Sequence, residues 1–190
     1  QAATWPEHLR IAVNLSPVQF RDPLLLEKIS NSIESAGLDP DRLELEITES
    51  TMMQTGETTI EKLHEIRKLG VRISMDDFGT GYSSLSYLRN FDFNTIKIDR
   101  SFVSCLDVDE GSQAIVHAII SLADCLGVST TAEGVETAEQ LAILTKMGCH
   151  EVQGYLFSAP RPECDLPAMI LRETLFKPDA KPAEVHQIAS

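Results

Sequence analysis

The sequence predicts an α/β protein in which parallel β-strands alternate with α-helices around one sheet. Six short apolar runs with strand-like alternation are each followed by a segment with helical periodicity. A strand, a helix and a second strand in succession imply parallel pairing through a right-handed crossover. Six such units favour a barrel or a doubly wound sheet. No Gly-x-Gly-x-x-Gly motif follows any strand, so a dinucleotide-binding fold has no support.

The elements follow one another in a regular order, and several have end signals. Asp22 and Pro23 indicate a helix start with Pro23 as the first helical residue, and Gly127 and Gly148 stand where helices end. The pair of residues 137 and 140, Thr and Gln, forms a capping-box pattern. The expected order is strand Arg10–Leu15, helix Leu24–Ser35, strand Leu43–Ile47, helix Thr58–Leu69, strand Val71–Met75, helix Ser84–Arg89, strand Thr95–Ile98, helix Ser112–Leu126, strand Val128–Ala132, helix Ala138–Met147, strand Glu151–Leu156 and helix Leu166–Leu175.

Composition and charge exclude several classes of function. The 190 residues suit one domain or a large part of one, and 43% hydrophobic residues are enough for a core. The formal net charge of −13 disfavours a DNA- or RNA-binding protein, because an acidic surface repels polyanions. A single small phosphate ligand remains compatible if bound cations reverse the local field.

The cysteines and the apolar stretches bear on the cellular location. No Cys-x-x-Cys pair occurs among the four cysteines, which are Cys105, Cys125, Cys149 and Cys164. Of these, Cys105 and Cys125 are expected to be small core residues. We infer a reducing, cytoplasmic setting. The apolar runs are far shorter than the ~18 to 20 residues of a membrane span, so any membrane tether must lie in another segment of the parent chain.

Strand parity selects one group of polar residues. Side chains alternate between the two faces of a strand, so Leu45 and Ile47 share a face that Glu44 and Glu46 oppose. The apolar face should meet the helices, which leaves the polar face for the interior. Parallel barrels carry their chemistry at the carboxyl ends of the strands. The residues placed inward at or just past those ends are Asn14, Glu46, Asp76, Lys97, Glu133 and Gln153.

Several carboxylates that point into one space repel one another, and divalent cations relieve that repulsion. Asp, Glu and Asn oxygens suit Mg²⁺, Mn²⁺ or Ca²⁺ rather than copper or structural zinc. The adjacent Asp76 and Asp77 can bridge two ions roughly 3.5–4 Å apart, as in two-metal hydrolases. Lys97 then supplies a fixed positive charge near the reacting phosphate.

The segment from Asp76 to Ser84 continues from the two aspartates into a glycine-rich loop. Gly79 and Gly81 permit unusual dihedral angles and close approach to a ligand. An ordinary strand-to-helix turn with local capping explains such a loop equally simply. Its direct attachment to the aspartates favours a mobile element that couples metal binding to substrate capture.

Five motifs together resemble the EAL-domain phosphodiesterases that hydrolyse cyclic di-GMP. They occur in order, with family-like spacing, from about residue 10 to about residue 172. The motifs are Asn14-Leu15-Ser16, Glu44-Leu45-Glu46-Ile47-Thr48-Glu49, Asp76-Asp77-Phe78-Gly79-Thr80-Gly81-Tyr82-Ser83-Ser84, Lys97-Ile98-Asp99 and Ala132-Glu133-Gly134-Val135-Glu136, with Gln153-Gly154-Tyr155 and Pro160 in addition.

The resemblance implies a (β/α) TIM-type barrel that cleaves one phosphodiester bond of cyclic di-GMP, giving linear pGpG with Mg²⁺ or Mn²⁺. Lys97 would contact the attacking water or the phosphate, and Glu133 would hold a metal or act as the general base. Glu49 would anchor the glycine-rich loop, which also contributes to dimerisation in the family. The implied metal ligands are Asn14, Glu46, Asp76, Asp77 and Glu133, and the implied substrate-binding or loop-anchoring residues are Glu49, Gly79, Thr80, Gly81, Tyr82, Ser83, Asp99, Glu136 and Gln153.

One departure from the family pattern concerns its first strands. The sequence has no Glu-Ala-Leu segment, whose glutamate is a metal ligand in the family. We therefore expect an incomplete barrel of about six parallel strands with flanking helices: an EAL domain over residues 1–176 that lacks its start, and a flexible tail over 177–190. Such a fragment is expected to be weakly active or inactive, and its unpaired edges favour a homodimer that is either strand-swapped or edge-paired. The parent chain is expected to carry sensor or GGDEF domains.

Two alternatives remain open. The first alternative is a non-catalytic cyclic di-GMP receptor or a protein-interaction module, which calorimetry with the nucleotide would distinguish from an enzyme. A barrel aldolase could use Lys97 as a Schiff base. However, nearby carboxylates should keep that lysine charged, and borohydride trapping would decide the point.

Overall fold

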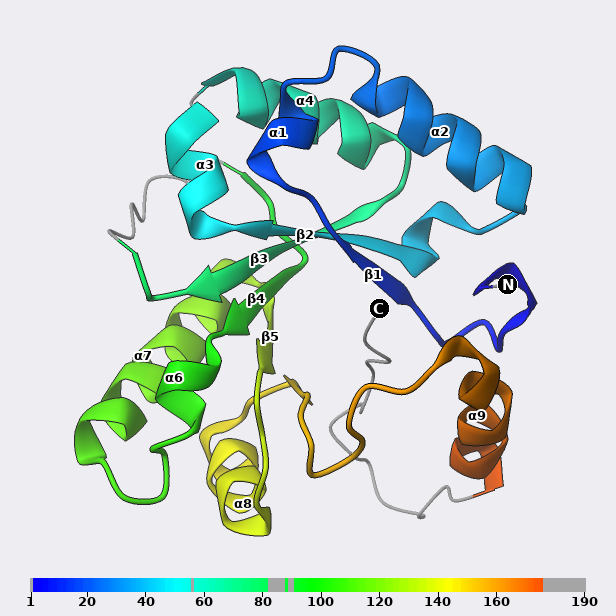
Figure 1. Cartoon of the computed structure of the whole chain (residues 1–190). Helices are drawn as coiled ribbons and strands as arrows, with labels where there is room; N and C mark the ends of the chain where they lie inside the picture. The colour runs from blue at the N-terminus through cyan, green and yellow to red at the C-terminus, as the bar shows by residue number, and fades with distance from the viewer. Residues whose placement is uncertain (1, 56, 82–87, 89–90, 176–190) are drawn as a thin grey trace.

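The computed structural model describes residues 2–55, 57–81, 88 and 91–175, which form a six-stranded parallel sheet (Figure 1). The strands lie in sequence order, so each pairs with the next one along the chain. This is the arrangement that alternating strands and helices predict. The strands are β1 (Ile11–Asn14), β2 (Leu43–Thr48), β3 (Arg72–Phe78), β4 (Thr95–Ile98), β5 (Ser129–Ala132) and β6 (Glu151–Val152).

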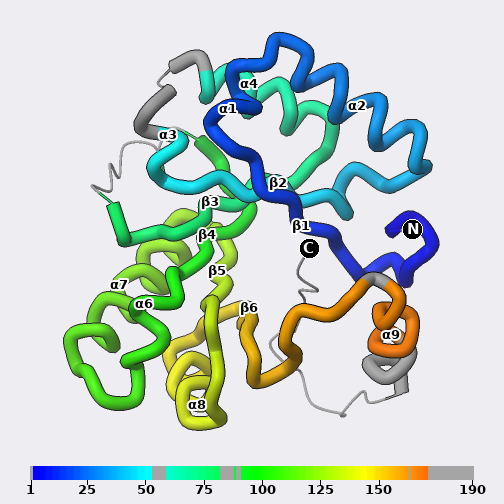
Figure 2. The backbone as a smooth tube through the Cα atoms, viewed as in Figure 1, coloured from blue at the N-terminus to red at the C-terminus, as the bar shows by residue number. Residues whose placement is uncertain are grey.

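The helices flank a curled sheet, as both views of the chain show (Figures 1 and 2). One group, α1 to α4, lies beside β1 to β3, and α6 to α8 lie beside β4 and β5. The helices are α1 (Pro17–Phe20), α2 (Leu25–Ala36), α3 (Glu49–Thr55), α4 (Glu57–Lys68), α6 (Arg100–Val103), α7 (Glu110–Leu126), α8 (Ala138–Met147) and α9 (Leu166–Leu175), with 3-10 turns at Ala2–Thr4, Pro40–Arg42 and Glu163–Asp165.

The hydrophobic core lies between the outer face of the sheet and the helices. Ile47, Ile73 and Ile96 are fully buried on that face, as strand parity predicts. They belong to one cluster with Leu63 of α4 and Ile120 of α7. Because this face is apolar along the sheet, the polar side chains of the same strands must point to the concave side.

The two edges of the sheet approach each other at the amino ends of the strands. Arg10, directly before β1, forms an ion pair of 3.5 Å with Glu151 at the start of β6. On the same side, α9 lies near the N-terminal segment in both views (Figures 1 and 2). Arg42 holds that segment in place by donating hydrogen bonds to the Leu9 and Ala2 carbonyls at 2.9 and 2.8 Å.

Several predicted helix ends are confirmed, and one is wrong. Gly127 and Gly148 end α7 and α8 with φ of 69° and 84°, and the capping box at residues 137 and 140 is present. Pro23 is not the first helical residue, because α2 begins at Leu25. Pro23 lies instead in a turn in which the Asp22 carboxylate accepts a hydrogen bond from Leu24 N.

The sixth strand is shorter than predicted, since β6 ends at Val152. The chain turns there because the Gln153 carbonyl accepts from Val135 N at 2.9 Å and Gly154 packs against the Val135 backbone. The placement of Cys105 and Cys125 in the core is also wrong. Both are exposed, and all four cysteines are free thiols.

Two predicted segments fall outside the described residues: most of the helix Ser84–Arg89 and the tail 177–190. In the part of the chain that the structure describes, no helix has the length and apolar character that a membrane crossing requires.

Candidate active site

Lys97 of β4 lies at the centre of a group of carboxylates on the concave side of the sheet. Its side chain is buried, with 4% of its surface exposed, and its Nζ lies 2.7 Å from Glu46 of β2 and 3.3 Å from Asp76 of β3. Glu133, which follows β5, approaches Nζ at 2.5 Å. Strand parity and the shared carboxyl edge of the sheet therefore bring four distant segments of the chain to one point.

Asn14 lies beside this group at the end of β1. In the parallel register it is the Cα partner of Glu46, and its side chain is exposed. It therefore has the position that a ligand from the neighbouring strand requires. We refer to Glu46, Asp76, Asp77, Lys97 and Glu133 as the carboxyl-end cluster.

Asp76 and Asp77 reach the same space through an irregularity in β3. Strict alternation would place adjacent side chains on opposite faces, but the register between β3 and β4 shifts between Met75 and Phe78. Asp77 has a φ of 54°, the one positive φ of a non-glycine residue in the described chain. This left-handed conformation is tolerated by Asp better than by most residues, and its strain indicates a functional constraint.

The donor atoms of the cluster fit a divalent cation. Oxygens of Asp76, Asp77 and Glu133 lie within 4.8 Å of one another. The buried Asp76 Oδ1 makes no hydrogen bond, and its described ionic partner is Lys97 Nζ at 3.3 Å. Carboxylate oxygens are the ligands that Mg²⁺ and Mn²⁺ prefer, and one ammonium group does not neutralise several carboxylates.

The electrostatics of the cluster reflect burial and an excess of negative charge. Burial raises the pKa of Glu133, although Lys97 acts in the opposite direction. Burial, with the charges of Asp76 and Asp99, raises the pKa of Asp77.

Burial opposes the charged form of Lys97, but the carboxylates of Glu133, Glu46 and Asp76 outweigh it and raise the lysine pKa above its ordinary value. A lysine held in the ammonium form is a poor Schiff-base nucleophile, so the geometry argues against the aldolase alternative.

The glycine-rich loop begins against Glu49, the first residue of α3. Glu49 is buried, and its Oε2 accepts a hydrogen bond from Gly79 N at 3.4 Å. A Cβ on Gly81 would lie 3.3 Å from the same carboxylate, and Thr80 donates to the Asp77 carbonyl at 2.8 Å. The role of Glu49 as the anchor of the loop stays a prediction. Tyr82 and Ser83 lie outside the described residues.

The remaining predicted residues have contacts of other kinds. Asp99 caps α6 by accepting from Ser101 N at 3.0 Å, and Glu136 pairs with Arg100 at 3.1 Å. Gln153 has a buried side-chain oxygen without a hydrogen-bond partner. For Asp99 and Glu136 these contacts are structural, and a contact with substrate stays a prediction.

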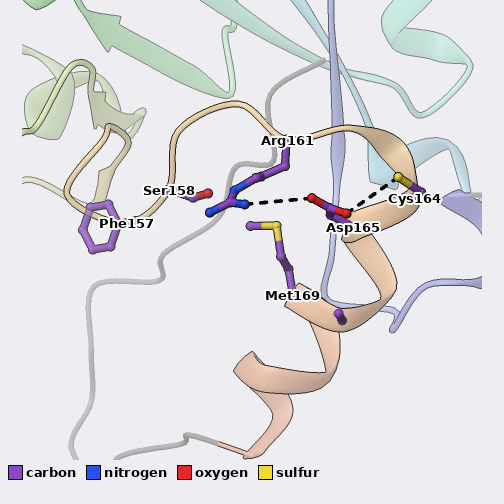
Figure 3. Close-up of a pocket in the computed structure, with 7 residues that line it drawn as sticks. Phe157, Ser158, Arg161, Cys164, Asp165 and Met169 are labelled. Atoms are coloured by element: carbon purple, nitrogen blue, oxygen red, sulfur yellow. Dashed lines mark hydrogen bonds and ion pairs between the residues drawn. The ribbon is translucent and has the colours of Figure 1, made fainter.

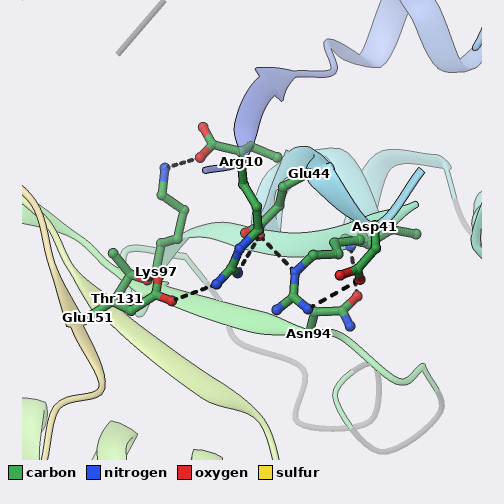
Figure 4. A network of polar contacts seen from close by, with 10 residues as sticks. Arg10, Asp41, Glu44, Asn94, Lys97, Thr131 and Glu151 are labelled. Carbon is green, nitrogen blue, oxygen red and sulfur yellow. Dashed lines mark hydrogen bonds and ion pairs between the residues drawn. The ribbon is translucent and has the colours of Figure 1, made fainter. Parts of the chain in front are cut away.

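A second polar network lies at the amino ends of the strands, and the sequence reasoning did not identify it. Glu44 is buried and lies 3.3 Å from Arg72 Nε and 3.8 Å from Arg10 (Figure 4). Glu151 pairs with Arg10 and accepts from Thr131 at 3.2 Å. Parity continued back to Arg72, the first residue of β3, and to Arg10, directly before β1, would have placed both arginines inward. We refer to Arg10, Asp41, Glu44, Arg72 and Glu151 as the amino-end network.

A separate pocket of about 450 Å³ lies between the loop after β6 and α9 (Figure 3). Phe157, Arg161, Cys164, Asp165 and Met169 are among its lining residues, and Arg161 pairs loosely with Asp165 at 4.0 Å. No member of the carboxyl-end cluster lines it. It is therefore not the candidate active site.

Comparison with known proteins agrees with the fold and the motifs. Residues 1–160 match the model of the EAL domain. The cyclic di-GMP phosphodiesterase NbdA of Pseudomonas aeruginosa is 45% identical over 82% of this chain and 20% of its own length. The chain spans between 20% and 24% of the length of the first curated relatives it matches.

Solved structures give the same result. The MucR phosphodiesterase in complex with c-di-GMP, a Pseudomonas aeruginosa protein, superposes with a TM-score of 0.79 and is 43% identical. That match covers 83% of this chain and 64% of the other. BlrP1 of Klebsiella pneumoniae, in a complex with manganese and the nucleotide, gives a TM-score of 0.74 at 34% identity over 79% of this chain and 38% of its own. The chain belongs to the EAL domain family.

Proposed function

We propose that this chain takes part in the metal-dependent hydrolysis of one phosphodiester bond of cyclic di-GMP, giving linear pGpG in bacterial second-messenger signalling. The observation that carries the proposal is the convergence of Glu46, Asp76 and Glu133 on Lys97, with Asp77 beside them. These side chains come from four separate strands, so no local structural need explains their meeting.

The roles of the residues follow from their positions. Asn14, Glu46, Asp76, Asp77 and Glu133 are the proposed metal ligands, and bound Mg²⁺ or Mn²⁺ would supply an activated water and offset charge on the phosphate. Glu133, whose pKa is raised by burial, is suited to accept a proton from the attacking water. Lys97 holds a positive charge within reach of the phosphate oxygens.

The proposed substrate class comes from the relatives named as cyclic di-GMP phosphodiesterases, and the charge of the chain is consistent with it. A cyclic dinucleotide carries two phosphate charges, and the acidic surface of the chain repels it. Cations held by the carboxyl-end cluster reverse the field at that one place. The loop from Gly79 to Gly81, anchored on Glu49, lies directly after the two aspartates and is proposed to help capture the nucleotide.

The test is release of pGpG from cyclic di-GMP with Mn²⁺. Turnover should require Mn²⁺ and should disappear in Asp76→Asn, while nucleotide binding is followed separately by calorimetry. We expect slow turnover, because the sequence contains no Glu-Ala-Leu segment and so lacks that glutamate as a ligand. If the wild-type chain neither binds nor hydrolyses the nucleotide, the proposal is contradicted.

The alternative to catalysis is a cyclic di-GMP receptor. Nucleotide binding with Mn²⁺ and no detectable pGpG over long incubation would support it. A protein-interaction module would show neither nucleotide binding nor pGpG release.

We also propose a cytoplasmic homodimer in a parent chain that carries sensor or GGDEF domains. The relative MucR is named a bifunctional diguanylate cyclase and phosphodiesterase, which supports such a fusion. β1 and β6 each have one strand partner among the described residues, which leaves an edge available to a second copy. Light scattering that gives a monomer mass at all concentrations would contradict the dimer.

A further inference from the structure

The buried ammonium of Lys97 occupies a place among the carboxylates that hold the metal in the proposed function. Its Nζ contacts Glu46, Asp76 and Glu133 at 2.7, 3.3 and 2.5 Å. Oxygens of two of these residues, Asp76 and Glu133, also belong to the group that can hold a cation. The same carboxylates therefore serve two positive charges.

We propose that Lys97 is an internal counterion that competes with the divalent cation for these carboxylates, and that it sets the metal affinity of the site below what the carboxylates alone would give. This inference rests on the proposed function. It assigns Lys97 a second role, in the metal-free protein, besides contact with the phosphate.

The argument is electrostatic. A buried cluster of carboxylates with no cation would be unstable, because the charged groups repel one another and have lost their water. Lys97 meets this need before any metal arrives, and the two glutamates place oxygens at hydrogen-bonding distance from it. A cation that arrives must share these oxygens and must also meet the repulsion of a nearby positive charge.

The open part of the cluster shows where the competition takes place. Asp77 makes no ion pair with Lys97 among the described contacts, and Asp76 Oδ1, at 3.3 Å, is the most distant of the three carboxylate oxygens that contact Nζ. Metal therefore has a point of entry at the two aspartates. Coordination through the Glu133 oxygen that contacts Nζ would withdraw that oxygen from the ammonium and would free Lys97 for a phosphate.

A simple structural or ligand-orienting role for Lys97 predicts the opposite result. If the ammonium only held the carboxylates in position, its removal would disorder them and would weaken metal binding. Competition predicts that removal strengthens metal binding while catalysis is lost. The sign of the change in affinity decides between the two.

The experiment is calorimetric titration of the 190-residue chain with Mn²⁺ alone. Lys97→Met, which removes the charge and keeps the length, should bind Mn²⁺ about tenfold more tightly or better, within the usual range of coupling between two sites. Lys97→Arg should stay near the wild-type affinity. Lys68→Met is the matched control, because Lys68 is exposed on α4 and its one ion pair among the described residues is with Glu65. It removes the same charge far from the site and should leave the affinity within about twofold.

Folding of the variants is followed by circular dichroism, with Lys97→Gln as a second neutral variant. If either neutral variant unfolds without Mn²⁺, refolding at Mn²⁺ concentrations below those that saturate the wild type supports the proposal. Failure to refold even at saturating concentrations overturns it.

The outcomes separate this inference from the proposed function. Equal or weaker Mn²⁺ binding in both neutral variants overturns the counterion role, while Mn²⁺ binding and pGpG release by the wild type keep the function. If the neutral variants bind Mn²⁺ and the wild type does not, the result supports the inference. No binding by any of the proteins overturns both the inference and the metal site.

Discussion

The two polar networks on the concave side of the sheet use the same kinds of side chain but differ in charge balance. The carboxyl-end cluster has four carboxylates and one ammonium. The amino-end network has two guanidinium groups for Glu44 and Glu151, with Asp41 joining at the exposed rim. The carboxyl-end cluster is left with excess negative charge, whereas the amino-end network is close to neutral.

This difference separates a binding site from a structural contact. Arginine has several donors in a planar fork, so Arg10 bridges Glu44 and Glu151, and Arg72 bridges Glu44 and Asp41. Lysine offers one compact charge, which cannot neutralise four carboxylates. The residual charge can be met by a divalent cation, and the amino-end network has no comparable need.

The largest expected effect is on metal binding at the carboxyl end. Asp76→Asn removes a charged ligand oxygen and should lower Mn²⁺ affinity at least about hundredfold, with loss of turnover. Glu151→Gln is the control, since it removes one negative charge from the amino-end network, and its Mn²⁺ affinity should stay within about threefold. Similar losses in both variants would show that overall charge, rather than the cluster, holds the metal.

Glu44→Gln should have the largest effect on stability. It leaves two arginines facing a neutral amide, and removal of one member of a buried ion pair is expected to lower the free energy of unfolding by about 3 kcal/mol. Urea unfolding measures this loss. Mn²⁺ affinity should change little, and a strong change there would mean that the two networks are coupled.

Gly154→Ala tests how rigidly the end of β6 supports the carboxyl-end cluster. A Cβ at this position would lie 2.2 Å from the Val135 carbonyl oxygen, so the backbone must shift, at a cost of about 2 kcal/mol. The matched control is Gly127→Ala, which has a positive φ and no atom within 4 Å of the added Cβ. Its cost should be about 1 kcal/mol. Equal losses of stability in the two variants, measured by thermal unfolding, would contradict the close contact between Gly154 and Val135.

Arg10→Met should have the smallest effect. Its ion pairs with Glu44 and Glu151 are long, and 23% of its side chain is exposed. Partly exposed pairs contribute about 1 kcal/mol or less. Urea unfolding measures the loss in the free energy of unfolding. If this loss equals that of Glu44→Gln, Arg10 holds the two edges of the sheet together more strongly than its geometry implies.

Much of the site was predictable because strand parity is a local rule. Glu46, Lys97 and Glu133 occupy inward positions that alternation with buried aliphatic residues defines, and the structure places all three together. The same rule, applied to Arg10 and Arg72, would have found the amino-end network. It was missed because the reasoning looked only at strand ends, where parallel barrels carry their chemistry.

The position of Asp77 could not be derived in this way. Alternation assigns it to the face opposite Asp76, and the shared position depends on a register shift against β4 and a φ of 54°. The end of β6 is similar, since its contact with Val135 joins segments that are distant in the sequence. The short helices α1 and α6 were also missed, because four residues are too few to show a helical period.

The sequence by itself determined the order of strands and helices, the parallel topology, the inward set of polar residues and the family motifs. These properties depend on periodicity and on residue type, which are read along the chain. Only the tertiary structure decided that Lys97 contacts three carboxylates at once, that the two arginines balance the amino-end acids, and that Asp77 turns inward. Such contacts depend on the register and curl of the sheet, because distances between side chains of different strands are fixed only when the strands are packed.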